Sequence, residues 1–206
     1  MFDWLVTWVT NVIETLGYPG LTVLVALENV FPPIPSEVIL PLAGFLTGQG
    51  RFSFVLVLIS STLGSLIGAL ILYAIGVGLG RGGIRRLFEK YGYLALLTPE
   101  DLTRAEVWFD RWGPIAVFTG RLVPVVRSLV SIPAGYRRMP LVQFIPLTIF
   151  GSLIWNGALV SLGWAFGENW HAIEEYVGVL QYIVIAVVAI LVLRFVWTRL
   201  RQRRAA

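Results

Sequence analysis

The stretch PIAVFTGRLVPVVRSLVSIPAGYRR, residues 114–138, is apolar enough to enter a lipid bilayer but carries two arginines and two prolines in its middle. Arg121 and Arg127 stand among Phe, Leu, Val and Ile, and the stretch contains no acid. A guanidinium at membrane depth costs at least about 2.5 kcal/mol and is normally kept where it faces a polar cavity or a ligand. Pro124 and Pro133 oppose one continuous helix. The stretch therefore predicts a broken, re-entrant hairpin that forms half of an anion site inside a membrane.

The composition is that of a protein with several membrane spans. Of the 206 residues, 57% are hydrophobic and 14% are charged, and the mean hydropathy is +0.79; a soluble domain of this size carries more charge. The net charge of +4 does not indicate nucleic-acid binding, because the basic residues fall between hydrophobic runs. The absence of cysteine excludes disulfides, thiol catalysis and zinc–thiolate sites. We expect no metal, no cofactor and no nucleic-acid partner.

A second interrupted apolar stretch covers residues 18–50. It contains three prolines within four positions, Pro32, Pro33 and Pro35. These prolines disfavour a helix through this point, so the stretch is predicted to enter the membrane, turn and return. Glu28 and Glu37 stand on its two arms. Two interpretations of these carboxylates remain open: they lie at the water boundary on a short loop, or they point into a cavity where a desolvated carboxylate can carry a proton.

The pattern of hydrophobic runs predicts an all-α polytopic membrane protein with a single membrane domain. Its parts in order are an amphipathic helix over 1–17, a first repeat over 18–80, a cytoplasmic segment over 81–113, a second repeat over 114–170, and a C-terminal transmembrane helix with a basic tail over 171–206. Each repeat is a proline-broken hairpin followed by a transmembrane helix, over 53–80 in the first and 141–168 in the second. Between the repeats, Thr98 is expected to cap a surface helix that ends near Gly113.

The two halves show a matching pattern of small residues. The tetrapeptide GSLI occurs twice, and each copy is followed by two glycines at the same spacing, in one half at 64–67, 76 and 80 and in the other at 151–154, 163 and 167. Counting spans back from a cytoplasmic C-terminus places most Lys and Arg on the inner side, as membrane topology requires. The two spans then run in opposite directions. Inverted repeats with paired broken segments are typical of transporters whose site lies near the midplane of the bilayer.

Two further polar residues were considered as candidates. Asn156 lies in the middle of the second predicted span, where hydrogen bonding between helices is favoured over contact with a substrate. His171, the single histidine, follows that span near the membrane interface and does not indicate catalysis. The sequence leaves open whether the protein forms a homo-oligomer.

The sequence resembles the DedA family of membrane proteins, also called the SNARE-associated or VTT-domain family. The motifs that carry the resemblance are ENVFPPIPSE (Glu28–Glu37), FTGRLVPVVR (Phe118–Arg127) and GYRRMPLVQF (Gly135–Phe144). The resemblance implies two re-entrant hairpins that face each other. For bacterial members it also implies return of undecaprenyl phosphate, a polyprenyl phosphate lipid, across the cytoplasmic membrane, driven by the proton motive force or by sodium.

By position, the resemblance makes Arg121 and Arg127 the phosphate-binding pair, and Glu28 and Glu37 the residues that carry the coupling proton or ion. Forked guanidinium donors suit a phosphate, and a carrier of a lipid anion needs cationic donors at depth. The alternatives are an energy-independent phospholipid scramblase, a proton-coupled antiporter for small cations or drugs, and a buried Arg–Glu scaffold without a transport role. An enzyme is disfavoured, because Ser36, Ser128 and Ser131 have no evident base beside them in the sequence beyond Glu37.

Overall fold

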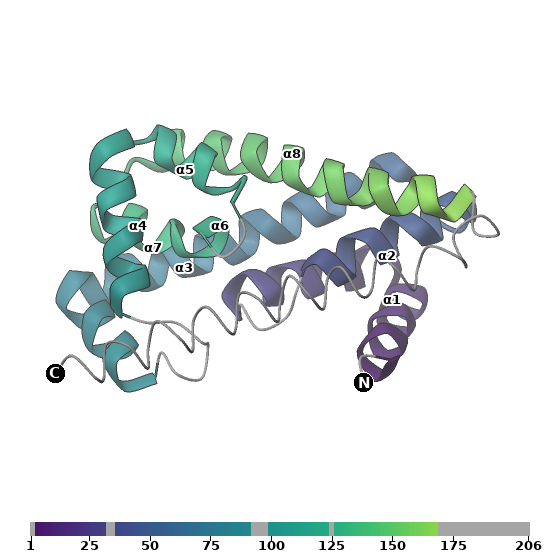
Figure 1. The fold of residues 1–206 in the computed structure, drawn as a ribbon, viewed down its shortest axis with the longest axis horizontal. Helices are drawn as coiled ribbons and strands as arrows, with labels where there is room; N and C mark the ends of the chain where they lie inside the picture. Colours follow the sequence, from purple (N-terminus) through teal and green to yellow (C-terminus); the bar gives the residue numbers. More distant parts are fainter. Residues whose placement is uncertain (1–2, 32–35, 92–98, 124–125, 169–206) are drawn as a thin grey trace, which may run out of the picture. The chain divides into compact units, whose positions relative to one another are not determined.

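The computed structural model describes residues 3–31, 36–91, 99–123 and 126–168. The chain divides into two units, Met1–Glu168 and Asn169–Ala206, and the described residues all belong to the first. His171, the predicted C-terminal helix and its basic tail lie outside the described residues. Within them the structure is helical without a strand (Figure 1). The helices are α1 (Asp3–Val30), α2 (Ser36–Gly48), α3 (Phe54–Tyr91), α4 (Pro99–Trp112), α5 (Ile115–Gly120), α6 (Val126–Leu129), α7 (Ser131–Tyr136) and α8 (Leu141–Glu168).

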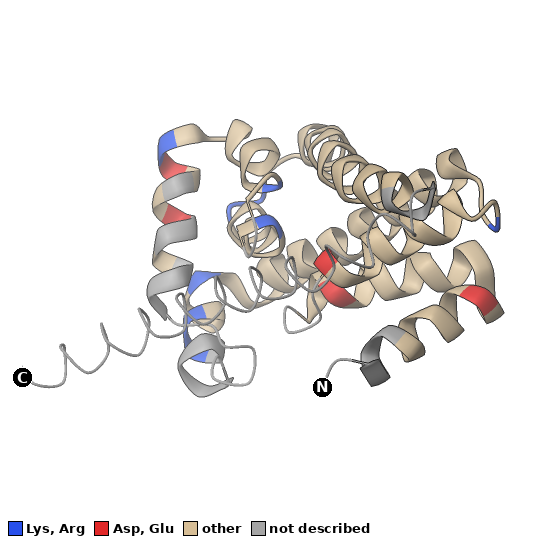
Figure 2. Cartoon of the chain, turned by 45° about the vertical axis from the view of Figure 1, so that its right-hand side comes forward, with Lys and Arg blue, Asp and Glu red and all other residues tan. Residues whose placement is uncertain are grey.

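Three of these helices are long and apolar enough to cross a membrane, over Thr7–Val30, Phe54–Arg86 and Leu141–Ala165. Long uncharged stretches of helix separate the few segments that carry acids and bases (Figure 2). Large apolar side chains on α3 and α8, including Leu63, Phe150 and Leu162, are exposed on the isolated chain, as expected for surfaces that face lipid. These features confirm the prediction of an all-α polytopic membrane protein, and α8 has the bounds predicted for the second span.

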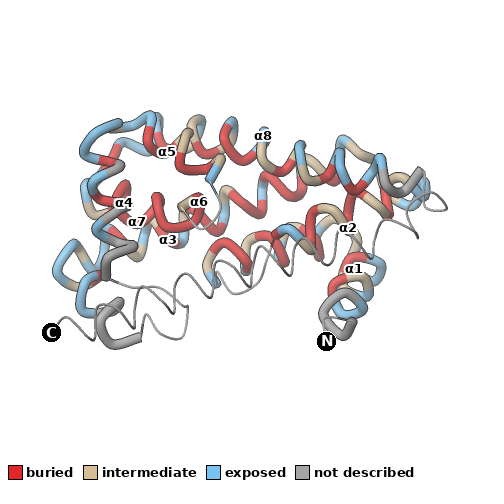
Figure 3. Tube along the Cα trace, viewed as in Figure 1, coloured by how far each residue is buried: buried red, intermediate tan, exposed pale blue. Residues whose placement is uncertain are grey.

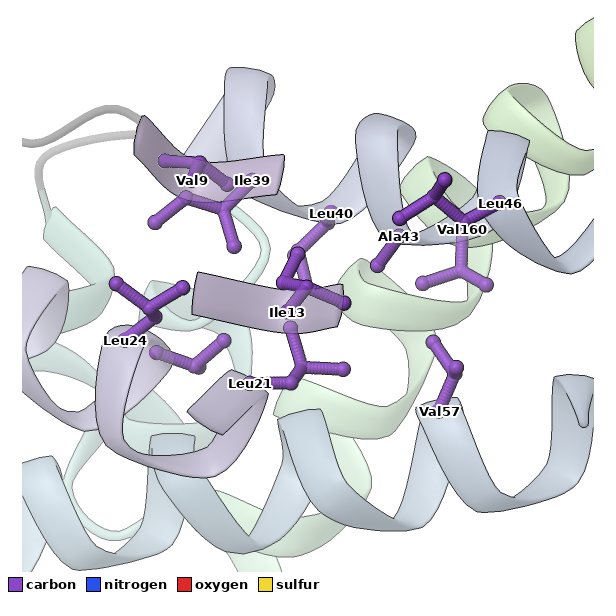
Figure 4. Close-up of a cluster of buried hydrophobic side chains, with 11 residues drawn as sticks. Val9, Ile13, Leu21, Leu24, Ile39, Leu40, Ala43, Leu46, Val57 and Val160 are labelled. Carbon is purple, nitrogen blue, oxygen red and sulfur yellow. The ribbon is translucent and has the colours of Figure 1, made fainter. Parts of the chain in front are cut away.

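Helix α1 changes direction at Gly17, at the boundary predicted between the amphipathic helix and the first repeat. Gly17 has φ +61°, a left-handed conformation that glycine adopts without the steric cost of a Cβ, and Pro19 follows in the next turn. The bend brings Val9 and Ile13 into an apolar cluster with the second part of α1, with α2 and with residues from α3 and α8 (Figure 4). The N-terminal arm is therefore packed onto the first interrupted segment.

Helix α3 is longer than predicted. The predicted span ends at residue 80, and there Gly80 has φ +60° and bends the helix, but α3 continues to Tyr91. A glycine at positive φ changes the direction of the helix axis without ending the helix, so the polar residues that follow Gly80 are still helical. Helix α4 ends where predicted, before Gly113, which has φ +54°. The expected cap Thr98 lies outside the described residues.

Two of the three most extensive helix contacts cross between the two halves of the chain, and the third, between α1 and α3, lies within the first half. Helix α2 packs along α8, and α3 packs against α1 and α7; buried residues follow these facing surfaces (Figure 3). At the first crossing, a Cβ on Gly163 would overlap the backbone carbonyl of Pro41. Where α3 packs against α7, a Cβ on Gly76 would overlap the backbone carbonyl of Ile132. Glycine therefore allows backbone-to-backbone contact, as small residues do between membrane helices.

Candidate functional site

In both interrupted segments one helix ends and the next begins near the prolines at which a break was predicted. Helix α1 ends at Val30 and α2 begins at Ser36, while α5 ends at Gly120 and α6 begins at Val126. The prolines themselves, at 32, 33, 35 and 124, lie outside the described residues. Pro133 was expected at a break; α6 ends at Leu129 and α7 begins at Ser131, so Pro133 lies in the first turn after an interruption. The first turn tolerates proline because its backbone N–H groups have no partner within the helix.

Arg121 is buried without a carboxylate partner in the described part of the chain. It follows α5 directly, and its residue is 2% exposed. One guanidinium nitrogen, Nη1, donates to Asn29 Oδ1 at 3.3 Å, and Nη2 donates to Ser131 Oγ at 2.8 Å. Its Nε has no hydrogen-bond partner among the described residues. Arg121 is thus a buried cation held by neutral oxygens.

Arg127, on α6, forms the ion pair of the site. Its Nη2 donates to Glu28 Oε1 at 2.6 Å, which links residues 99 positions apart in the sequence. Its guanidinium carbon lies 5.8 Å from the centre of the Trp155 ring on α8, within the range of a cation–π contact. Glu28 is 1% exposed, and its second oxygen, Oε2, has no partner among the described residues. The pair joins the two interrupted segments.

Asn29 is a site residue that the sequence analysis missed. Its Oδ1 accepts from Arg121 and, at 3.4 Å, from Ser128 Oγ, while its Nδ2 donates to the carbonyl of Val25. Asn29 is fully buried. Its position in the sequence could have indicated it, because Asn29 follows Glu28 inside one of the motifs that carry the family resemblance. It was overlooked because an amide carries no charge.

The other predicted residues have different surroundings. Glu37, in the first turn of α2, is exposed. The structure therefore brings Glu28 together with the arginines and leaves Glu37 at the surface of the isolated chain. Asn156 on α8 is buried, and its Nδ2 donates to Ser65 Oγ on α3 at 3.2 Å. That bond matches the role between helices that the sequence favoured for Asn156.

The site carries an excess of positive charge. Among the described residues of this site there are two buried guanidiniums, from Arg121 and Arg127, and one buried carboxylate, that of Glu28, which pairs with Arg127. A buried charge without a counter-charge is costly, and neutral hydrogen bonds offset that cost only in part. Within the described residues no group of three or more His, Cys, Asp or Glu could hold a metal ion. The arrangement is suited to binding an anion.

A second polar network ties α3 and α4 to α7, and its central carboxylate, Glu106, lies on α4, outside the apolar spans. Glu106 on α4 accepts hydrogen bonds from Arg81 at 3.0 and 2.7 Å and from the Tyr136 hydroxyl at 2.9 Å. Arg137 forms an ion pair with Asp110, also on α4. Partial burial opposes ionisation of Glu106, but the hydrogen bonds from Arg81 and Tyr136 outweigh it and hold the pKa of Glu106 below its usual range.

This network predicts a pH-dependent contribution to stability. Because the pKa of Glu106 is lowered in the folded state, its contribution is present above the unfolded pKa of about 4.3 and is lost as the pH falls through the lower folded value. We expect Glu106→Gln to lower the free energy of unfolding by about 1 kcal/mol at pH 7, and the difference to shrink as the pH falls below about 4.3. Melting of the detergent-solubilised variant and parent over this pH range measures it. The exposed ion-pair variant Asp110→Asn is the control and should show less pH dependence; a constant difference for Glu106→Gln would contradict the assignment.

Together, the apolar spans and the interrupted segments define a polytopic membrane protein with a buried cluster of charged and polar side chains between the two interrupted segments. Residues 34–165 match the family model described as the VTT domain, so the chain belongs to the VTT-domain or DedA family, and the resemblance noted from its motifs is confirmed.

Several curated proteins are similar over most of their length. An undecaprenyl phosphate transporter A from Staphylococcus aureus is 35% identical over 95% of this chain and 98% of its own. A protein of the same name from Bacillus subtilis is 34% identical, over 93% of this chain and 91% of its own. A protein from Lactococcus lactis subsp. cremoris named alkaline phosphatase-like is 44% identical, over 89% of this chain and 86% of its own. No solved structure matches the chain.

Proposed function

We propose that this protein is a lipid-phosphate transporter that moves undecaprenyl phosphate across the bacterial cytoplasmic membrane for re-use in cell-envelope synthesis. The observation that carries the proposal is the buried Arg121, whose charge no carboxylate among the described residues offsets. The names of the relatives from Staphylococcus aureus and Bacillus subtilis support the choice of lipid. In this proposal the phosphate supplies the missing negative charge, and Arg121 and Arg127 bind its oxygens with forked, charge-assisted hydrogen bonds.

The proposed architecture is an inverted repeat of two re-entrant hairpins. In support, the small residues with matching spacing make matching contacts. A Cβ on Gly44 would overlap the backbone of Val160 on α8, and a Cβ on Gly135 would overlap that of Tyr73 on α3. Gly64 meets the carbonyl of Thr22, and its counterpart Gly151 meets the carbonyl of Phe118 in the other half. In each half one hairpin arm thus packs on the span of the other half, through Gly44 or Gly135, and the other arm packs on the span of its own half; matching contacts of this kind support two interlocked copies.

The proposed coupling uses the ion pair between Arg127 and Glu28. In the structure Arg127 donates to Glu28 at 2.6 Å. Arrival of phosphate on Arg127 and neutralisation of Glu28 by a proton, or its pairing with a sodium ion, would break this pair and leave no uncompensated carboxylate. Glu37, exposed at the start of α2, is proposed as the second residue of this path. The proposed topology has a cytoplasmic C-terminus and an Arg-bearing hairpin that opens inward. The proposed partners are the transported lipid and the surrounding membrane lipids.

An enzyme is not the function that this geometry favours. Ser128 Oγ donates to Asn29 Oδ1, and Ser131 Oγ accepts from Arg121. Neither an amide nor a guanidinium takes up a proton from a serine, so these contacts do not activate a nucleophile. The phosphatase-like name of the Lactococcus lactis relative therefore has no counterpart in the contacts of these two serines.

Transport in proteoliposomes tests the proposal. The parent is expected to move undecaprenyl phosphate, and Arg121→Gln is expected to reduce transport by about tenfold or more, because loss of a charged contact in a desolvated site costs about 2–5 kcal/mol. The variant should melt at or above the temperature of the parent, because glutamine removes an unpaired buried charge. Parent-like transport by Arg121→Gln would overturn the binding role. If the parent still transports after collapse of the ion gradients, and Glu28→Gln transports like the parent, an energy-independent scramblase would be favoured instead.

A further inference from the structure

Asn29 supplies Arg121 with an oxygen acceptor that carries no charge. The amide is fully buried, as is its neighbour Ser131, and both bond the same guanidinium. A carboxylate would fit the same place and would bind the guanidinium more strongly, since charge-assisted hydrogen bonds are about twice as strong as neutral ones. The chain has Glu at the preceding position, where it pairs with Arg127. Glu28 therefore offsets the charge of Arg127, whereas the adjacent Asn29 bonds Arg121 without offsetting its charge.

We infer that Asn29 is a specificity-determining residue, which keeps the charge of Arg121 available for the phosphate by acting as its neutral stand-in when the site is empty. The inference rests on the proposed lipid-phosphate site. It adds that the site needs an uncharged acceptor at position 29, and that the two arginines have distinct roles: Arg127 is held by a carboxylate, and Arg121 holds the charge that selects an anionic headgroup.

The packing of Asn29 fixes this acceptor in place. Its Nδ2 donates to the carbonyl of Val25 at 3.3 Å, one turn earlier in α1, so Oδ1 is turned toward Arg121 and Ser128. On the other side, a Cβ on Gly68 of α3 would approach the carbonyl of Ala26 to 2.7 Å and would crowd the Cβ of Asn29. Helix α3 therefore lies directly against the backbone that carries the amide, and the acceptor has little freedom to move away from the guanidinium.

One oxygen is shared by two donors, and this has a consequence for binding. Asn29 Oδ1 accepts from Arg121 Nη1 at 3.3 Å and from Ser128 Oγ at 3.4 Å, both long for hydrogen bonds of their kind. Arg121 Nε has no partner among the described residues. A phosphate offers several strong acceptor oxygens, so it can replace one weakly held amide oxygen and also satisfy Nε. An aspartate at position 29 would hold Arg121 tightly and cancel its charge.

Two substitutions at this position separate selection from packing. Asn29→Asp keeps the shape and the acceptor but adds a negative charge, whereas Asn29→Ala removes the acceptor and keeps the charge of the site. We expect Asn29→Asp to bind farnesyl phosphate in detergent at least about tenfold more weakly than Asn29→Ala, because a nearby negative charge repels the phosphate in a desolvated site. Without ligand, Asn29→Asp should melt at a higher temperature than Asn29→Ala. A purely structural role predicts that Asn29→Asp retains binding better than Asn29→Ala, and that result would overturn the inference.

Calorimetry with farnesyl phosphate, with uncharged farnesol as the control ligand, distinguishes the possible failures. If the parent binds farnesyl phosphate no better than farnesol, the proposed function fails and the inference fails with it. If the parent prefers farnesyl phosphate but Asn29→Asp binds it as well as the parent does, only the inference fails. Should Asn29→Asp not fold, Ser131→Asp adds a carboxylate at the other partner of Arg121 and is expected to weaken binding to the same extent; parent-like binding by this variant overturns the inference.

Discussion

Replacing Arg127 by glutamine is expected to lower the free energy of unfolding by about 3–5 kcal/mol, because it leaves the Glu28 carboxylate buried without its cation. Glu28 is 1% exposed and forms its ion pair with Arg127 at 2.6 Å. Its second oxygen, Oε2, already lacks a partner among the described residues, and the variant would also remove the one counter-charge that pairs with this carboxylate. Thermal or chemical unfolding in detergent measures the loss.

The double variant Glu28→Gln with Arg127→Gln is the matched control. It removes both charges and leaves two amides that can bond each other, so most of the lost stability should return. Transport of the lipid phosphate should not return, because one of the two proposed phosphate ligands is still missing. Recovery of transport by the double variant would show that Arg127 acts only as a partner for Glu28. Equal stability of Arg127→Gln and the parent would contradict the ion pair itself.

Adding one methyl group at Gly76 or Gly163 is expected to destabilise the fold by about 3 kcal/mol or more, at the upper end of what overpacking costs. At each position the new Cβ would overlap a backbone carbonyl, of Ile132 on α7 or of Pro41 on α2. A backbone cannot move aside as the end of a flexible side chain can, so the two helices must separate. Unfolding of Gly76→Ala and Gly163→Ala in detergent checks this expectation.

Each of these variants has a control glycine on its own helix. A Cβ at Gly78 on α3 would meet nothing within 4 Å, and a Cβ at Gly157 on α8 would lie 3.8 Å from Leu58 Cδ1, an ordinary contact. Alanine favours a helix interior by about 1 kcal/mol over glycine, so Gly78→Ala and Gly157→Ala should be neutral or stabilising. Equal losses at all four positions would contradict the role of the close crossings, since helix propensity alone favours alanine at each position.

Local chemistry explains why parts of the fold were predictable. Hydrophobic runs of span length give the helices that cross the membrane, and the bounds of α8 follow directly from one of them. A glycine at positive φ and a following proline mark the bend of α1 at Gly17. The interruptions between α1 and α2 and between α5 and α6 fall at the predicted prolines. These features depend on residues close together in the sequence.

The position of Pro133 in the first turn of α7, and the continuation of α3 beyond Gly80, were not predicted. A proline has no N–H, but this destabilises a helix only beyond its first turn, where each N–H is needed as a donor. The sequence does not show at which residue α7 begins. In the same way, a glycine can end a helix or only bend it. The outcome depends on what the next turn packs against.

The sequence by itself determined that two arginines and two glutamates lie in interrupted, apolar segments, because proline geometry and hydrophobic length act locally. Only the tertiary structure decided that Glu28 pairs with Arg127, that Glu37 is exposed, and that the uncharged Asn29 is the partner of Arg121. Those pairings join residues more than 90 positions apart, and the packing of α1, α3 and α8 around the short helices selects one pairing among several that the charges alone would allow.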